Sequence, residues 1–127
     1  MLNKKIIETP NAPKPVGPYS QAVQVGQFLF CSGQIAIDPK TNNVMGGPVK
    51  EQTKLVLENI KAILEAADAN FENIVKTTIF LKRMGDFVAV NEVYGGYFKQ
   101  NPPARSTVEV SALPKGVDVE IEVIAVV

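Results

Sequence analysis

The sequence predicts an α+β domain, a two-layer sandwich in which two helices cover one face of a mixed β-sheet. Two long stretches carry apolar residues at steps of three and four, which is typical of amphipathic helices. Several shorter stretches alternate polar and apolar residues, which is typical of half-buried strands. The expected order is strand, strand, helix, strand, helix, strand, strand, and two helices can cover one face of such a sheet. The 127 residues contain no internal repeat or linker, so we expect a single domain over residues 1–127.

The N-terminal part predicts an edge strand at Ile6-Ile7 followed by a stiff loop. Residues 10–20 contain four prolines and a glycine, which impose an extended, irregular backbone. This loop would present Tyr19 at a fixed place. An aromatic side chain in such a loop can equally plug the edge of the core, so both readings of Tyr19 stay open.

Two strands are expected next, at residues 22–25 and 28–31, with Gly26-Gln27 as the tight turn of a hairpin. Ser32-Gly33-Gln34 ends the second strand. A glycine there permits either the close approach of another group to the backbone or a β-bulge.

The helical segments are expected from about Val49 to Ala69 and from Asp86 to Phe98. In the first, apolar residues recur as one stripe, and in the second, Asp86 is a suitable N-cap. Gly95-Gly96 lies inside the second helix at a cost of about 1 kcal/mol per glycine. Between the helices, residues 73–82 predict a strand. The buried side of the second helix is expected to comprise Phe87, Val90, Val93, Tyr94, Tyr97 and Phe98.

The C-terminal stretch predicts a β-hairpin. Residues 106–110 and 117–123 alternate with period two, and Leu113-Pro114-Lys115-Gly116 supplies a turn. Directly opposed residues of an antiparallel pair share a face, so matching apolar residues places the polar residues together on the other face. That face would carry Arg105, Thr107, Glu109, Asp118, Glu120 and Glu122. It is either a functional platform or a solvated face whose ion pairs each contribute about 0–1 kcal/mol.

The sheet face without helices is expected to be partly apolar, because Ile124 and Val126 lie on the same side as Glu120. A monomer seldom leaves such a face in water. We therefore expect self-association through this face.

Composition excludes several kinds of function. Thirteen basic residues balance thirteen acidic ones, so the chain lacks the basic field that nucleic acids or anionic membranes require, and neither is an expected partner. No apolar run approaches a membrane span or a signal peptide, and the single Cys31 is compatible with the cytoplasm. Cys31 lies in an apolar run, which favours a buried, inert thiol.

The sequence contains no histidine. This removes Ser-His and Cys-His nucleophile pairs and histidine metal sites, and one cysteine cannot form a thiolate zinc site. Any catalysis must use other side chains, backbone groups and water. We expect no metal site.

Motifs along nearly the whole chain resemble those of the RidA family, the reactive intermediate (imine) deaminases also called the YjgF family. The resemblance is strongest at Pro103-Ala104-Arg105-Ser106 and Val119-Glu120-Ile121-Glu122. The other motifs that support it are Gly17-Pro18-Tyr19-Ser20-Gln21-Ala22, Ser32-Gly33-Gln34, Lys76-Thr77-Thr78, Asp86-Phe87 with Val90-Asn91, Val108-Glu109-Val110, and Leu113-Pro114-Lys115. The match of all of them in order and spacing is specific.

The resemblance implies a chorismate-mutase-like α+β fold and a homotrimer with ligand sites between subunits. It also implies hydrolysis of 2-imino acids, chiefly 2-iminopropanoate (the tautomer of 2-aminoacrylate) and 2-iminobutanoate, to 2-oxo acids and ammonia. These imines arise from pyridoxal-phosphate-dependent dehydratases. No cofactor of the protein itself is implied.

The family's substrate-carboxylate arginine corresponds to Arg105, and its water-handling glutamate to Glu120. Family pocket positions also correspond to Tyr19, Ser32, Gly33 and Asn91. Where many members have cysteine two residues after the arginine, this chain has Thr107. A backbone contact with substrate at that position would survive the change, whereas a reactive thiol is ruled out there.

The side chains suit this chemistry. A guanidinium binds a carboxylate through two parallel hydrogen bonds, and a glutamate that deprotonates water can supply about 10²–10⁴-fold in rate. Burial would raise the pKa of Glu120, whereas a nearby Arg105 would lower it, and the sequence leaves this balance open.

Two other functions remain open. One is a regulatory module that binds small carboxylates at Arg105 without turnover. The other is the RNA cleavage or inhibition of translation ascribed to some family members, against which the zero net charge argues.

Overall fold

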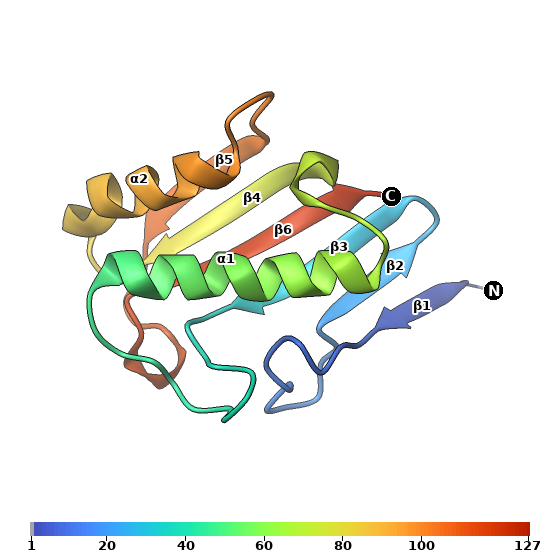
Figure 1. Cartoon of the computed structure of the whole chain (residues 1–127), viewed down its shortest axis with the longest axis horizontal. Helices are drawn as coiled ribbons and strands as arrows, with labels where there is room; N and C mark the ends of the chain where they lie inside the picture. The colour runs from blue at the N-terminus through green and yellow to red at the C-terminus, as the bar shows by residue number, and fades with distance from the viewer. Residues whose placement is uncertain (1) are drawn as a thin grey trace.

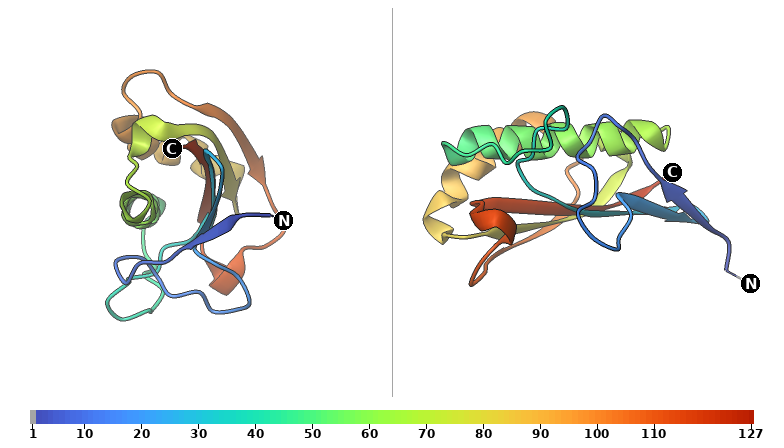
Figure 2. Two further views of the ribbon diagram at one scale, coloured as in Figure 1. Left: turned by 90° about the vertical axis from the view of Figure 1, so that its right-hand side faces the viewer. Right: turned by 90° about the horizontal axis from the view of Figure 1, so that it is seen from below.

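The computed structural model describes residues 2–127 and has one six-stranded mixed sheet with two helices on one face. The strands are β1 (Lys4–Ile7), β2 (Ala22–Val25), β3 (Phe28–Gln34), β4 (Ile74–Leu81), β5 (Ala104–Glu109) and β6 (Val119–Val126); the helices are α1 (Val49–Ala66) and α2 (Phe87–Tyr97). Figure 2 shows the helices in one layer and the sheet in another. The predicted two-layer α+β sandwich is confirmed.

The order of strands across the sheet is β1-β2-β3-β6-β4-β5 (Figure 1). β5 runs parallel to β4, and the other neighbours are antiparallel. β1 and the β2–β3 hairpin are found where the sequence predicts them.

The predicted C-terminal hairpin is wrong, because β4 lies between β5 and β6 (Figure 1). The residues between these strands contain the short 3-10 turn Pro114–Gly116, from which β6 enters the centre of the sheet. Alternate residues of β6 are fully or nearly fully buried, whereas no residue of β5 is buried. β6 therefore gains more burial between β3 and β4 than beside β5 at the edge.

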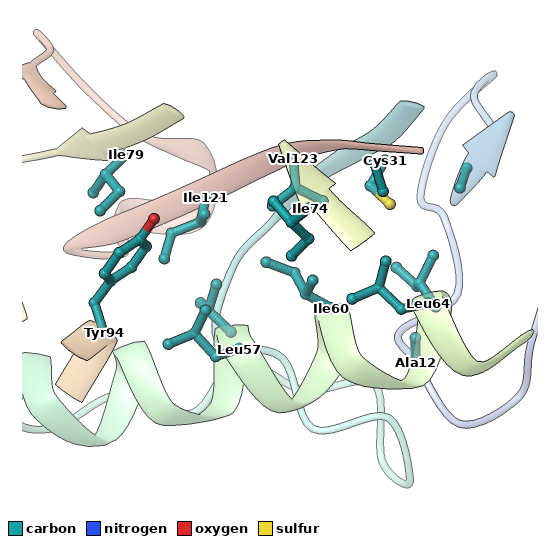
Figure 3. Close-up of a cluster of buried hydrophobic side chains, with 14 of the residues drawn as sticks. Ala12, Cys31, Leu57, Ile60, Leu64, Ile74, Ile79, Tyr94, Ile121 and Val123 are labelled. Atoms are coloured by element: carbon teal, nitrogen blue, oxygen red, sulfur yellow. The ribbon is translucent and has the colours of Figure 1, made fainter. Parts of the chain in front are cut away.

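The core lies between α1 and the sheet. Leu57, Ile60 and Leu64 of α1 point toward Ile121 and Val123 of β6 (Figure 3), and all five are at most 2% exposed. α1 ends at Ala66, three residues before the predicted end. Asp68 has a left-handed backbone (φ 56°), and the Ala69 N–H donates to the Leu64 carbonyl, so this turn stops the helix.

α2 includes Gly95 and Gly96, as expected. Its predicted buried side is confirmed in part: Val90 and Tyr94 are buried, and Phe87, Val93, Tyr97 and Phe98 are half-buried. Asp86 precedes the helix as predicted, but its side chain caps no backbone N–H. A 3-10 turn at Met84–Asp86 leads into the helix instead.

The face of the sheet opposite the helices is partly apolar and uncovered. Ile124 and Val126 are half-buried there, and Phe30 is paired with Ile124. Ile6, Phe28, Phe30 and Val108 on this face are each more than a third exposed. We call this surface the helix-free face. Its apolar character agrees with the sequence prediction.

Candidate functional site

Arg105 and Glu120 point to opposite faces of the sheet. Thr77 of β4 is paired with Arg105 on one side and Val123 on the other, so Arg105 lies toward the helices. Phe80 is paired in the same way with Val108 and Glu120. Because Thr77 and Phe80 are three residues apart on one strand, their faces are opposite.

The expectation that these two side chains share a face of a hairpin is therefore wrong. It assumed that β5 and β6 were neighbours. With β4 between them, the alternation along each strand carries Arg105 to the helix side and Glu120 to the helix-free face. The predicted site residues form two groups, one around each side chain.

The first group, the Arg105 cluster, lies where β5 meets α2. Arg105 Nη1 donates a 2.6 Å hydrogen bond to Asn91 Oδ1. Its guanidinium carbon is 5.5 Å from the ring centre of Phe87 and 5.0 Å from that of Tyr94. Both distances fall within the range of cation–π attraction. The guanidinium is thus fixed by α2, with donors left over beyond the one that Asn91 accepts.

Thr107 belongs to the same cluster. It follows Arg105 by two residues on β5 and therefore points to the same side. Its Oγ1 is buried and has no hydrogen-bond partner in the described chain. A buried hydroxyl without a partner is costly, and a ligand at Arg105 could satisfy it.

The second group, the Glu120 cleft, is a hollow of about 490 Å³ that includes part of the helix-free face. It brings together four of the predicted site residues, Tyr19, Ser32, Gly33 and Glu120, from the proline-rich loop, β3 and β6. Further lining comes from Pro13, Lys14, Val16, Gln21, Gln34, Ile35, Ile37, Pro114, Lys115 and Glu122.

Tyr19 does not plug the core. Its side chain is 49% exposed, and its hydroxyl accepts a 3.4 Å hydrogen bond from the Val16 N–H. Ser32 is fixed by its own bonds: Oγ donates to the Ser20 carbonyl at 2.6 Å, and the backbone N–H donates to the Gln21 carbonyl at 2.9 Å.

Gly33 makes room for the Glu120 carboxylate. A methyl group built at Gly33 would overlap Oε2 of Glu120 and lie 2.9 Å from its Cδ. The register between β3 and β6 also shifts between Cys31 and Gln34. Both alternatives predicted for this glycine, close approach and an irregular strand, are present.

The pKa of Glu120 is raised, chiefly by burial and secondarily by the negative charge of Glu122. Arg105, on the other face, does not oppose this within one chain. Of the two opposing effects on the pKa of Glu120 that the sequence left open, burial is therefore the larger within a single chain.

Gln21 anchors the loop that carries Tyr19, a role that sequence reasoning missed. Its buried amide Nε2 donates to the carbonyls of Pro13 at 2.9 Å, Thr9 at 3.1 Å and Ala12 at 3.3 Å. Its Oε1 accepts a 2.7 Å bond from the Thr9 N–H. The only sequence signal was its place in the motif that begins at Gly17.

Burial raises the pKa of the Cys31 thiol to about 12, in line with the predicted inert thiol. Among residues 2–127, no three His, Cys, Asp or Glu side chains are grouped so that they could hold a metal ion. Neither helix in that range combines the length and the hydropathy needed to cross a bilayer.

Comparison with known proteins places this architecture among close relatives. Residues 9–127 match the family model described as Endoribonuclease L-PSP. The chain is 58% identical over 122 residues to a RutC family protein of Pyrococcus horikoshii, covering 96% of this chain and 97% of that protein. It is 49% identical to the 2-iminobutanoate/2-iminopropanoate deaminase of Mus musculus, covering 97% and 91%. The crystal structure of E. coli TdcF with bound serine matches with a TM-score of 0.92 and 45% identity, covering 97% and 98%.

Proposed function

The chain belongs to the Endoribonuclease L-PSP family, also called the RidA or YjgF family, and on this premise we propose that it hydrolyses 2-imino acids. The substrates would be 2-iminopropanoate (with its tautomer 2-aminoacrylate) and 2-iminobutanoate, and the products 2-oxo acids and ammonia. Relatives named for this reaction are 46% and 49% identical to the chain. The observation that carries the proposal is the fixed guanidinium of Arg105, which keeps donors free beside the unpaired Thr107 hydroxyl.

Arg105 would bind the substrate carboxylate. With Nη1 engaged by Asn91, the remaining in-plane donors can form a two-pronged bond with a carboxylate. Such charge-assisted bonds contribute about 1.5–3 kcal/mol, enough to hold a small acid weakly. The Thr107 hydroxyl or backbone would complete this end of the site.

Glu120 would act on water. Its raised pKa makes the ionised carboxylate a better base than that of an ordinary glutamate. As Glu120 takes a proton from water, the oxygen bonds to the carbon of the protonated imine and gives a carbinolamine. Glu120 then returns the proton to the amine, the C–N bond breaks, and the hydroxyl proton leaves with ammonia as ammonium.

Both side chains would meet the same substrate only across a contact between two copies of the chain. Arg105 and Glu120 face opposite sides of one sheet. We infer a homotrimer in which the helix-free face is buried and the Arg105 cluster of one copy faces the Glu120 cleft of the next. The exposed Phe28 and Phe30 support burial of that face.

Within the combined site, Asn91 would orient Arg105. Tyr19 and Ser32 would line the pocket from the cleft side, and Gly33 would leave space for the Glu120 carboxylate. A pocket with these polar groups and a glycine suits a small acid.

A second candidate is a regulatory trimer that binds small carboxylates without turnover. The related E. coli TdcF was crystallised with serine, an amino acid and not an imine, which favours ligand binding of this kind. RNA as the main ligand is disfavoured, because the 13 basic and 13 acidic residues cancel.

The test is a coupled assay in which a dehydratase generates the imine and the release of 2-oxo acid is followed with and without the protein. We expect faster release with the wild-type chain. Glu120→Gln should lose most of this acceleration but keep its affinity for 2-oxo acids. If the wild-type chain binds 2-oxo acids but does not accelerate their release, the enzymatic function is contradicted and the regulatory function is favoured.

A further inference from the structure

The guanidinium of Arg105 lies close to two aromatic side chains of α2. Phe87 and Tyr94 are seven residues apart, which is about two helical turns and roughly 10 Å along the axis. The guanidinium carbon is 5.5 Å from one ring centre and 5.0 Å from the other. Both rings are thus within cation–π range of the guanidinium, while Asn91, one turn along the same helix from Phe87, accepts one of its hydrogens.

The position of the Tyr94 ring is set by the core and not by Arg105. Tyr94 is 5% exposed, and Figure 3 shows it reaching from α2 toward Ile79 of β4. Its hydroxyl shares a 2.8 Å hydrogen bond with Oγ1 of Thr77, which is fully buried. Thr77 is the residue paired with Arg105 in the β4–β5 register. The ring is therefore a fixed support for a side chain that is otherwise long and flexible.

We propose that Tyr94 and Phe87 are positioning residues that set the plane of the Arg105 guanidinium and thereby the plane of the bound carboxylate. The proposal rests on the proposed function, because it concerns how the same arginine receives a 2-imino acid. All donors of a guanidinium lie in its plane. Two rings in contact with the guanidinium restrict how this plane can turn, and Asn91 already accepts from one of its edges.

Two physical effects make the rings matter. Cation–π attraction holds the cation more strongly as water is excluded, which is the condition when a substrate enters. A preset plane also spares the ordering of the side chain on binding. Because the carboxylate is bonded directly to the imine carbon, a fixed carboxylate sets the direction of that bond and so limits where the imine carbon lies relative to the attacking water.

The ring contacts with Arg105 and the hydrogen bond of the Tyr94 hydroxyl can be removed by different substitutions, which gives matched variants. Tyr94→Leu and Phe87→Leu each remove a ring. Tyr94→Phe and Thr77→Val remove the 2.8 Å hydrogen bond and keep the ring. The measurements are the affinity for pyruvate by titration calorimetry, kcat and KM for the imine, and the melting temperature.

We expect Tyr94→Leu and Phe87→Leu to bind pyruvate about 3- to 30-fold more weakly, with a lower kcat as well. Tyr94→Phe and Thr77→Val should melt at a lower temperature yet keep most of the affinity. A purely structural role predicts instead that affinity follows the melting temperature in all four variants. If Tyr94→Leu fails to fold, Phe87→Leu at the half-buried start of α2 decides the matter.

Unchanged pyruvate affinity in the ring-removing variants that fold would overturn the inference while the proposed function stands. Equal loss in Thr77→Val and Tyr94→Leu would also overturn it, since the hydrogen bond and not the ring would then be what counts. A wild-type protein that neither binds pyruvate nor hydrolyses the imine would overturn the proposed function, and this inference with it.

Discussion

Glu120 occupies an environment that disfavours its charge. Burial and the Glu122 carboxylate, two residues away on the same side of β6, both raise its pKa. The folded state therefore holds the Glu120 proton more tightly than the unfolded state does. The ionised Glu120 therefore lowers the free energy of unfolding at pH values above its raised pKa in the folded state. This cost disappears at pH values below the pKa of Glu120 in the unfolded state. A cost of this kind at a solvent-accessible cleft is typical of functional carboxyl groups.

The pH dependence of activity follows from these two causes. If Glu120 must be ionised, kcat/KM falls as the pH is lowered through its raised pKa. Glu122→Gln removes one cause of the rise, so the acid limb of the profile should move to lower pH, through an electrostatic effect that salt screens. The shift should shrink at high salt. An acid limb that does not respond to Glu122→Gln would assign it to another group.

Gly33 is predicted to matter through Glu120 alone. Gly33→Ala would place a methyl group against the carboxylate, which is the end of a flexible side chain and can rotate away. A displacement of about 1 Å can cost up to ~100-fold in rate, so we expect turnover to fall at least about tenfold while the melting temperature changes little.

The matched control is Gly46→Ala, because nothing lies within 4 Å of a methyl group at that position. This variant should keep full turnover. Wild-type turnover in Gly33→Ala would mean that the observed position of the Glu120 carboxylate is not the catalytic one.

At the scale of elements, helices were more predictable than strand partners. The apolar stripe of α1 is a local signal, and it located this helix to within three residues at its C-terminal end. Alternation of polar and apolar residues could not show which strands lie beside β5 and β6. It indicates which face of a strand is buried and not which strand is its neighbour. Burial over the whole sheet decided instead for β4 as the partner of both.

The same limit affected the site. The sequence predicted Arg105 and Glu120 as site residues on one face, whereas the strand order places them on opposite faces. It identified Phe87 and Tyr94 as residues of the buried side of α2. Their contact with Arg105 depends on the parallel placement of β5 beside β4, which is a long-range feature.

The proline-rich loop offers a test at this scale. Gln21→Leu removes four hydrogen bonds to the loop that carries Tyr19 and leaves Thr9 and Pro13 backbone groups unpaired. We expect the free energy of unfolding to fall by about 1–3 kcal/mol, together with a loss of turnover. Gln24→Leu, which removes one bond near the Gly26 turn, is the control. Equal stability of the two variants in urea denaturation would contradict the anchoring role.

For the molecule as a whole, the site and the uncovered face point to the same arrangement. The helix-free face carries exposed Phe28 and Phe30, and it also carries Glu120, which the Arg105 of its own chain does not face. Burial of this face against other copies would remove the two phenylalanines from water and would bring Glu120 near an Arg105 of another copy. Light scattering should give a mass of about three times the 13.8 kDa chain. A stable monomer at micromolar concentration would contradict the shared site.

We propose that each site combines Arg105 from one copy with Glu120 from another. The most direct test of this arrangement mixes two inactive variants, Arg105→Ala and Glu120→Gln, by unfolding them together and refolding them. In a cyclic trimer with random mixing at equal amounts, about a quarter of the interfaces would contain both native side chains. We therefore predict that imine hydrolysis returns to about a quarter of the value of wild-type protein refolded in the same way, while each variant refolded alone stays inactive. Mixed trimers that form but recover no activity would contradict the account.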